Sequence, residues 1–210
     1  MWTFKKLQSK EKSMIWVLPV LAAVGVGAWI YNSVTEEEQQ AQRDWHKKSK
    51  SVEKTVSKRR KEIERHIRQA QSSYNFHYLV EMHYSSVQIA NAAYKLLDDA
   101  RISLRAISTM LNNVKQQKLS LERDLAFAKG QKNRAAIIRI IEELKQINAY
   151  RRALFEEKDK QKAEKDNLYQ EVKRLNQQTG ELKQHIRLRC GNKGQTWFLN
   201  LEQRKKQRGT

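Results

Sequence analysis

Two stripes of apolar residues run through residues 76–186, and they are out of phase with each other. Within each stripe, apolar or small residues recur at alternating steps of three and four, which is typical of a coiled-coil seam. The first stripe extends from Phe76 to Ala128 and the second from Ile137 to Ile186. In one uninterrupted helix they would lie on faces roughly 150° apart, so no single partner could cover both. A reversal of the chain between them would bring the stripes face to face, and the sequence therefore predicts an antiparallel coiled-coil hairpin.

The predicted reversal falls within "AKGQKNRAA", residues 128–136. Gly130 suits the left-handed position that ends a helix, and Asn133 suits the N-cap of the returning helix. We expect a first arm at 72–129, a turn at 130–133 and a second arm at 134–189, each arm on the order of 80 Å long. A bend within one longer rod is the alternative. The turn would form a cationic tip, a candidate contact surface made of Lys129, Gly130, Lys132, Asn133 and Arg134.

The composition agrees with an all-α protein built from long helices rather than from a thick globular core. Hydrophobic residues make up 39% of the chain and charged residues 31%, and seven glycines and one proline leave few turn signals. Lysine and arginine number 42 against 23 acidic residues, which gives a net charge of +19. Such a field favours an anionic partner, which could be acidic lipid, a cell-wall polymer or nucleic acid. The single cysteine, Cys190, excludes an internal disulfide.

Residues 14–33, which follow a short basic tail at 1–13, form an uncharged and mostly apolar segment. Its length matches the roughly 30 Å hydrocarbon core of a bilayer, so we predict a single transmembrane anchor. A cleaved signal peptide lacks a convincing cleavage site here. A buried core helix would need an apolar partner, which the rest of the chain does not offer by sequence. The candidate anchor residues are the interfacial aromatics, the early proline and a small-residue pair, together with the first residue: Met14, Trp16, Pro19, Ala23, Gly27, Trp29 and Tyr31.

The charges on either side of this anchor allow two orientations, and we predict the one with a cytoplasmic N-terminus. Four lysines in the tail favour a cytoplasmic N-terminus, which places the bulk of the chain outside the cytoplasm of a bacterial inner membrane. Arg43 and the lysines that follow it argue for the opposite orientation.

A basic stretch at 36–70 follows the anchor, with only a thin apolar stripe of Val52, Val56, Ile63 and Ile67. We expect a solvated helical stalk, with a loosely packed bundle as the alternative. Symmetric pairing about the turn places leucines of the first arm opposite Lys158 and Lys165. Either a second copy or partner covers the first arm there, or this middle region is a solvated patch.

Residues 190–210 are expected to form a turn and a short C-terminal basic helix. Gly191 and Gly194 are the predicted turn residues, and Thr196 is the predicted cap. The apolar face of the helix either packs on the aromatic base of the hairpin or presents a basic, aromatic patch to a polyanion. The candidate residues of this basic aromatic base come from the start of the hairpin and from the C-terminal helix itself: Tyr74, Phe76, Tyr78, Trp197, Phe198, Arg204, Lys205 and Lys206.

No catalytic, cofactor-binding or metal-binding motif is recognisable, and His77, His83 and His185 lack ligand-like spacing. We therefore expect no enzyme activity, no catalytic residue, no cofactor and no metal. The expected function is a membrane-anchored scaffold, tether or spacer, which forms a homo-oligomer or binds a protein through its coiled coil, with the tip meeting a partner away from the bilayer. The alternatives are a cytoplasm-facing, membrane-tethered binder of nucleic acid or another polyanion, and a non-catalytic subunit of a secretion, lysis or defence assembly.

Overall fold

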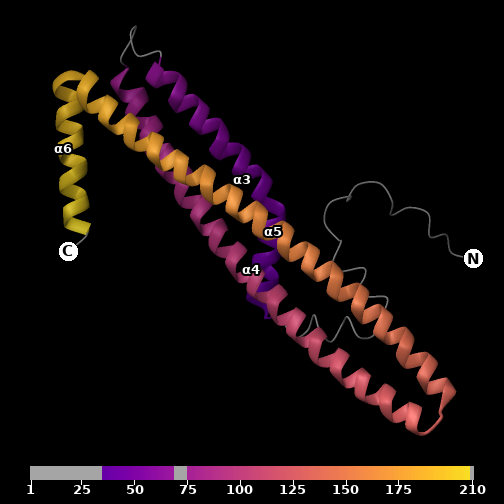
Figure 1. Cartoon of the computed structure of the whole chain (residues 1–210). Coiled ribbons are helices and arrows are strands. Elements are labelled where there is room, and N and C mark those ends of the chain that lie inside the picture. The colour runs from indigo at the N-terminus through magenta and orange to yellow at the C-terminus, as the bar shows by residue number, and fades with distance from the viewer. Residues whose placement is uncertain (1–34, 69–74, 209–210) are drawn as a thin grey trace, which may run out of the picture. The chain divides into compact units, whose positions relative to one another are not determined.

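The computed structural model describes residues 35–68 and 75–208, and these residues form four helices and no strand. The helices are α3 (Glu36–Arg68), α4 (Phe76–Gly130), α5 (Arg134–Arg189) and α6 (Gly191–Arg208) (Figure 1). The predicted all-α class is confirmed for this part of the chain. The basic tail, the predicted anchor and Tyr74 lie outside the described residues. Among the four described helices, none is both long enough and apolar enough to cross a bilayer.

The described residues fall into two compact units. The first, here called the turn unit, combines the start of α3 with residues 99–164, so it contains the connection between α4 and α5. The second, the base unit, combines residues 48–98 with the chain from residue 165 onwards, and it contains α6. Each unit is described separately below.

In the turn unit, α3 begins with a reciprocal cap immediately after the predicted anchor. The backbone N–H of Glu38 donates to the Thr35 hydroxyl at 3.2 Å, and the Thr35 N–H donates to the Glu38 carboxylate at 3.0 Å. This Ser/Thr-x-x-Glu arrangement satisfies amide groups that would otherwise lack a helical partner. Three acids in the first turn also favour this helix end electrostatically. The sequence thus starts a helix three residues after Ser33, where the predicted anchor ends.

The chain reverses between α4 and α5 within three residues, which gives the predicted helical hairpin. Two hydrogen bonds close the end of α4: the Asn133 N–H donates to the Ala128 carbonyl at 3.0 Å, and the Lys132 N–H donates to the Lys129 carbonyl at 3.1 Å. These are the two bonds of a Schellman motif. Asn133 then caps α5, because its side-chain oxygen accepts from the Ala136 N–H at 3.1 Å, as predicted.

The prediction that Gly130 adopts the left-handed conformation is wrong. Gly130 is the last helical residue of α4, and Lys132 carries the positive φ of 53° instead. The physical reason is the hydrogen-bond pattern, because a motif closed on the Ala128 carbonyl requires its left-handed residue four positions later. The glycine therefore correctly indicated a turn in this region, but it did not indicate which residue adopts the left-handed conformation.

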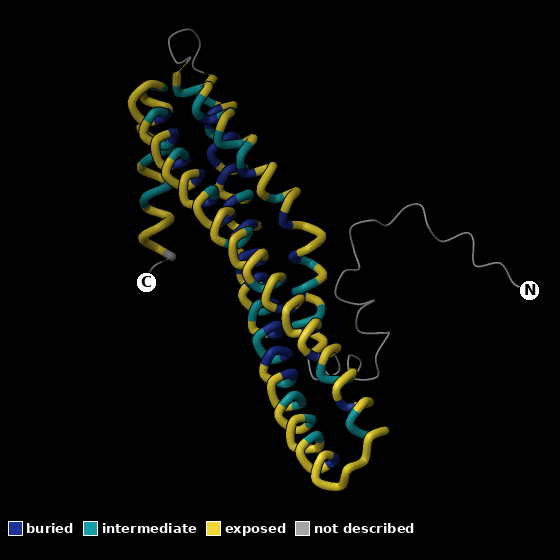
Figure 2. The backbone as a smooth tube through the Cα atoms, turned by 45° about the vertical axis from the view of Figure 1, so that its right-hand side comes forward, coloured by how far each residue is buried: buried dark blue, intermediate teal, exposed yellow. Residues whose placement is uncertain are grey.

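Along the hairpin, the residues of both predicted stripes face inwards. In the turn unit they contribute to one apolar cluster, whose buried members are Ala106, Ile107, Met110, Leu111, Val114, Ile147, Tyr150 and Leu154. Figure 2 shows buried positions recurring along the hairpin arms. The second stripe recurs at steps of three and four from Ile137, and Arg151 is the one position of it that is exposed. Burial raises the pKa of Tyr150 to about 12, and its hydroxyl donates to the Met110 sulfur at 3.7 Å.

The expectation of a solvated stalk is not met, because α3 packs as a third helix. In the turn unit, Ala41 is 5% exposed and Trp45 is fully buried, and His46 pairs with Glu157 of α5 at 3.3 Å. Ser103 and Gln161, near the polar middle, are also fully buried, and the Ser103 hydroxyl donates to the Gln161 side-chain oxygen at 3.2 Å. In this unit, α3 of the same chain therefore packs on the hairpin.

In the base unit, α3 packs against both hairpin arms. Val56 and Ile63 are fully buried. Arg60 pairs with Glu171 of α5 at 2.6 Å, and the Tyr78 hydroxyl of α4 donates to Glu62 at 3.2 Å. On α4, a second set of buried residues lies outside the predicted stripe, at separations of seven or fourteen positions: Met82, Leu96, Ser103 and Met110.

The C-terminal helix α6 starts earlier than predicted, and only one of its two predicted turn glycines is a turn residue. Gly191 has a positive φ of 57° and reverses the chain after α5. Gly194 lies inside α6, where an added Cβ would stand 2.1 Å from the Ile186 carbonyl oxygen. Thr196 is consequently a helical residue rather than a cap. Because glycine has no Cβ, position 194 allows the backbone of α6 to pack closely against the last turn of α5.

Candidate binding surfaces

The end of the hairpin, in the turn unit, presents the predicted cationic tip. All five residues named for it are exposed, which places three cationic side chains around the turn: Lys129, Lys132 and Arg134. In the described part of the chain these cations form no ion pair within 4.0 Å, whereas Arg139 lies 3.6 Å from Glu143. No Asp or Glu occurs between residues 125 and 141, so this end carries an uncompensated positive charge.

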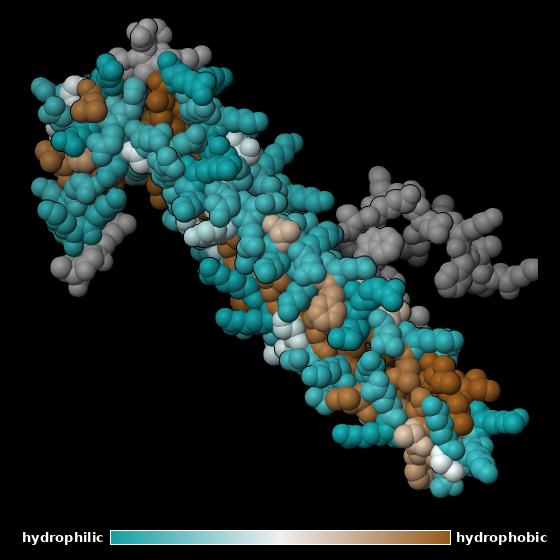
Figure 3. Space-filling view, in the orientation of Figure 1, coloured by the Kyte–Doolittle hydropathy of each residue, from teal (hydrophilic) through white to brown (hydrophobic). Residues whose placement is uncertain are grey.

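The same end also exposes large apolar side chains, which the sequence analysis missed. Phe127 on α4 is 71% exposed, and Ile138 on α5 is 70% exposed, with Ile141 at 40%. At 100° per residue, Phe127 and Ile138 point away from the seams of their own helices, so they lie on opposite outer sides of the hairpin. Figure 3 shows hydrophobic residues gathered near this end in one view. The available signal was "AAIIRII", where apolar residues are doubled beside the seam positions.

The start of α3 lies on the same side of the turn unit as this end. The pairs His46–Glu157 and Arg60–Glu171, one in each unit, are both separated by 111 residues. Because the separation is the same for both pairs, residue numbers increase in the same direction along α3 and α5, and both helices rise by the same amount per residue. The same offset places Glu36 level with Ile147, which is 13 residues after Arg134, or about 20 Å along the axis. Glu36, the first residue of α3, therefore lies at the end of that helix that is nearer the turn.

The predicted aromatic base is partly assembled, around α6 in the base unit. Trp197 donates its ring N–H to the Tyr84 hydroxyl at 3.2 Å and lies edge-on to His83 at 5.1 Å. Phe198 is covered by two cations of α5, Lys183 at 4.6 Å and Arg187 at 4.7 Å from its ring centre. The apolar face of α6 thus packs on the hairpin, which was the first of the two alternatives for this helix.

The other base residues take different roles. Phe76 is half-buried beside the ring of His77, and Tyr78 contacts α3 rather than α6. The cations Arg204, Lys205 and Lys206 are exposed. Lys205 lies 3.9 Å from Glu202, which Lys183 also contacts, and this hydrogen bond from Lys183 holds the pKa of Glu202 below its usual value. The basic charge of α6 is therefore partly engaged within the chain.

His83 lies in the seam, where the base unit holds it in its neutral form. It is 6% exposed, and burial together with the positive charges of Lys183 and Lys205 lowers its pKa to about 4. Its ring packs against Trp197, and its Nδ1 atom has no hydrogen-bond partner. Protonation would place a positive charge in a buried site near Lys183 and Lys205, which disfavours the charged form of His83.

Lowering the pH from 6.5 to about 4 is expected to weaken the base unit by about 2 kcal/mol through His83 alone. The folded-state pKa lies below the unfolded value, so this stability is fully present above pH 6.5 and is lost as the pH falls. The measurement is the unfolding free energy of the protein and of its His83→Phe variant across this range. The variant keeps an aromatic ring at this position, and its pH profile should be flatter. Parallel profiles would contradict this assignment.

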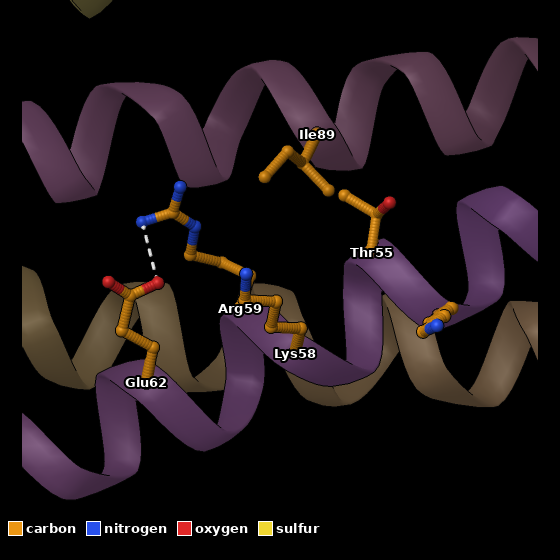
Figure 4. Close-up of a pocket in the computed structure, with 6 residues that line it drawn as sticks. Thr55, Lys58, Arg59, Glu62 and Ile89 are labelled. Atoms are coloured by element: carbon orange, nitrogen blue, oxygen red, sulfur yellow. Dashed lines mark ion pairs between the residues drawn. The ribbon is translucent and has the colours of Figure 1, made fainter.

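A cavity of about 480 Å³ opens beside α3 in the base unit, lined by Lys54, Thr55, Lys58, Arg59, Glu62 and Ile89 (Figure 4). Arg59 and Glu62 pair at 3.1 Å, and the Thr55 hydroxyl donates to the Ser51 carbonyl at 2.9 Å. Arg59 and Glu62 thus pair with each other, and the Thr55 hydroxyl is engaged by the backbone rather than by a general base. Among residues 35–68 and 75–208, no group of three or more His, Cys, Asp or Glu side chains is placed to hold a metal ion.

The candidate surfaces are therefore the apolar and cationic hairpin end and the basic face of α6. No protein-family model, curated protein or solved structure matches this chain.

Proposed function

We propose that the protein is a single-pass, membrane-anchored coiled-coil scaffold, held in a bacterial inner membrane by residues 14–33. The observation that carries this proposal is the packing of α3 against the hairpin, with Trp45 buried and His46 paired to Glu157. A flexible linker would let an anchored domain move freely. Here the helix that follows the anchor is itself part of the folded core, so a force or position at the membrane is transmitted directly to the hairpin.

The two arms supply the extended part of this scaffold. They contain 55 and 56 residues, and a continuous helix of that size is about 80 Å long. Long helices joined by a seam present much surface for their mass but enclose few of the concave pockets that catalysis requires. A non-catalytic role in assembly follows, in which exposed cations on the arms and on α6 contact an anionic partner.

The test is membrane retention of the full chain expressed in a bacterium. We expect it to remain in the membrane pellet after alkaline carbonate washing, because about 20 apolar residues span the hydrocarbon core. Leu21→Arg with Val24→Arg should release it, since charged residues at the centre of a span are strongly disfavoured. Leu21→Ile with Val24→Ile is the matched control and should be retained. A reporter fused after Thr210 that is active only outside the cytoplasm would support the predicted orientation.

Release of the unaltered chain by carbonate would contradict the anchored scaffold. If the retained chain carried a reporter active only in the cytoplasm and bound duplex DNA with an affinity that falls steeply with salt, the polyanion-binding alternative would replace the scaffold.

A further inference from the structure

We propose that the end of the hairpin makes a second contact with the bilayer that holds the anchor, by inserting Phe127, Ile138 and Ile141 among acidic lipid head groups. This inference rests on the proposed anchored function. It reverses the sequence-based expectation that the tip meets a partner away from the bilayer.

The turn of the hairpin lies near the start of α3, the helix that follows the predicted anchor. Glu36 lies about 20 Å from the turn along the axis, at the end of α3 that faces it. The predicted anchor ends at Ser33, and the three residues to Glu36 span at most about 10 Å. With residues 14–33 in the bilayer, its surface lies within reach of Glu36, and the hairpin end extends about 20 Å beyond the first turn of α3 along the axis.

The second step is the placement of the apolar side chains. Phe127 and Ile138 are 71% and 70% exposed, on opposite outer sides of the two arms. A groove on a protein partner would cover one side of the hairpin and leave the other in water. The interfacial layer of a bilayer surrounds whatever enters it, so it can cover both sides at once.

The third step is the charge at the turn. Lys129, Lys132 and Arg134 lie between Phe127 and Ile138 along the chain, and no acid occurs between residues 125 and 141. Cations beside apolar groups match a surface in which phosphate head groups lie above acyl chains. Nucleic acid would satisfy the cations but would leave the isoleucines in water.

Two other occupants would cover the isoleucines without explaining the cations. One is the segment 14–31 folded back on the hairpin end, which is uncharged after Ser13. The other is a second copy of the chain, which would bring equal positive charges together. Both are outcomes of the experiment below.

The experiment places one spin label at a time in the full chain, reconstituted in phosphatidylcholine vesicles with and without one quarter phosphatidylglycerol. In a Cys190→Ser background, the labelled variants are Ile138→Cys, Ala163→Cys and Val24→Cys. Ala163 is an exposed residue of the same unit, about 24 Å from the level of Glu36 on the other side. Val24 reports on the anchor itself. Collision with dissolved oxygen and with an aqueous nickel chelate is measured for each label.

We expect the Ile138 label to lose its accessibility to nickel and to gain accessibility to oxygen in vesicles that contain the acidic lipid, while the Ala163 label stays in water. Lys129→Glu with Lys132→Glu and Arg134→Glu should return the Ile138 label to water. The charge-matched control, Arg152→Glu with Lys160→Glu and Lys162→Glu, changes three exposed cations of the same unit and should leave it inserted.

The outcomes separate the two proposals. A Val24 label that is open to nickel would overturn the anchored function and this inference together. A shielded Val24 label with an Ile138 label in water would overturn the inference alone. An Ile138 label that is shielded from both nickel and oxygen would indicate protein cover, by segment 14–31 or by a second copy, and would also overturn it.

Discussion

Replacing Trp45 with alanine is expected to lower the free energy of unfolding by about 3–5 kcal/mol. Trp45 is fully buried in the turn unit, one residue before the His46–Glu157 pair that joins α3 to α5. Truncation removes the largest side chain that α3 contributes there and leaves a cavity lined by rigid helices. The measurement is urea-induced loss of helical circular dichroism for the full chain in detergent.

Two variants control this measurement. Trp45→Phe retains most of the buried ring and removes a ring N–H that has no hydrogen-bond partner, so its loss should be much smaller. Lys47→Ala changes an exposed side chain of the same helix and should be nearly neutral. If Trp45→Ala cost no more than Lys47→Ala, α3 would be the solvated stalk that the sequence suggested, and the rigid coupling of the anchor to the hairpin would be wrong.

Gly194→Ala is expected to undock α6, at a cost of about 3 kcal/mol or more. The new Cβ would stand 2.1 Å from the Ile186 carbonyl oxygen and 3.0 Å from the Cβ of Cys190. The nearest atom belongs to the backbone of α5, so the contact can be relieved only by moving one helix away from the other. The contacts of Trp197 with His83 and of Phe198 with Lys183 should be lost as a consequence.

Limited trypsin digestion measures this undocking, because Arg189 and Lys193 flank the junction of α5 and α6. Cleavage there should be much faster in Gly194→Ala than in the parent protein. Gly180→Ala is the matched control: Gly180 is a helical residue of α5 with no heavy atom within 4 Å of an added Cβ, so alanine should stabilise the helix. Equal digestion of Gly194→Ala and the parent would show that α6 is held by other contacts.

The hairpin was predictable because its evidence is periodic and local. A phase jump between two stripes can be read from residue spacing alone, and so can Asn133 as a cap, since a cap acts on amides two or three residues away. The left-handed residue was not predictable in the same way. Lys132 accepts a conformation that glycine would adopt more easily, because the hydrogen bonds of the motif offset the local cost.

The packing of α3 could not be read from its composition. The helix is rich in cations, and its buried positions are spread over Ala41, Trp45, Val56 and Ile63, with a polar Ser49 among them. A stripe this thin is compatible with a stalk or with a packed helix, and the choice depends on whether a partner surface exists. That surface includes Glu157 of α5 in the turn unit, and Glu171 of α5 with Tyr78 of α4 in the base unit, and the stripe of α3 alone does not reveal it.

The candidate surfaces show the same division between local and tertiary information. The cations of the turn were identified by their proximity in sequence, and the structure exposes them. Phe127 and Ile138 were missed because each belongs to an apolar run in which some residues must face the seam. Which residues do so depends on the helix phase that the turn imposes.

The buried pair of Ser103 and Gln161 has a consequence for how the two arms find each other. Repeating seams can align in several ways that differ by one or more heptads, since apolar layers resemble one another. In this hairpin, one layer contains the Ser103 hydroxyl and the Gln161 amide. A slipped alignment would set Gln161 against aliphatic carbon, and losing its hydrogen bond would cost about 1–3 kcal/mol of stability. We therefore expect this layer to favour the observed alignment of the arms over alignments shifted by a heptad.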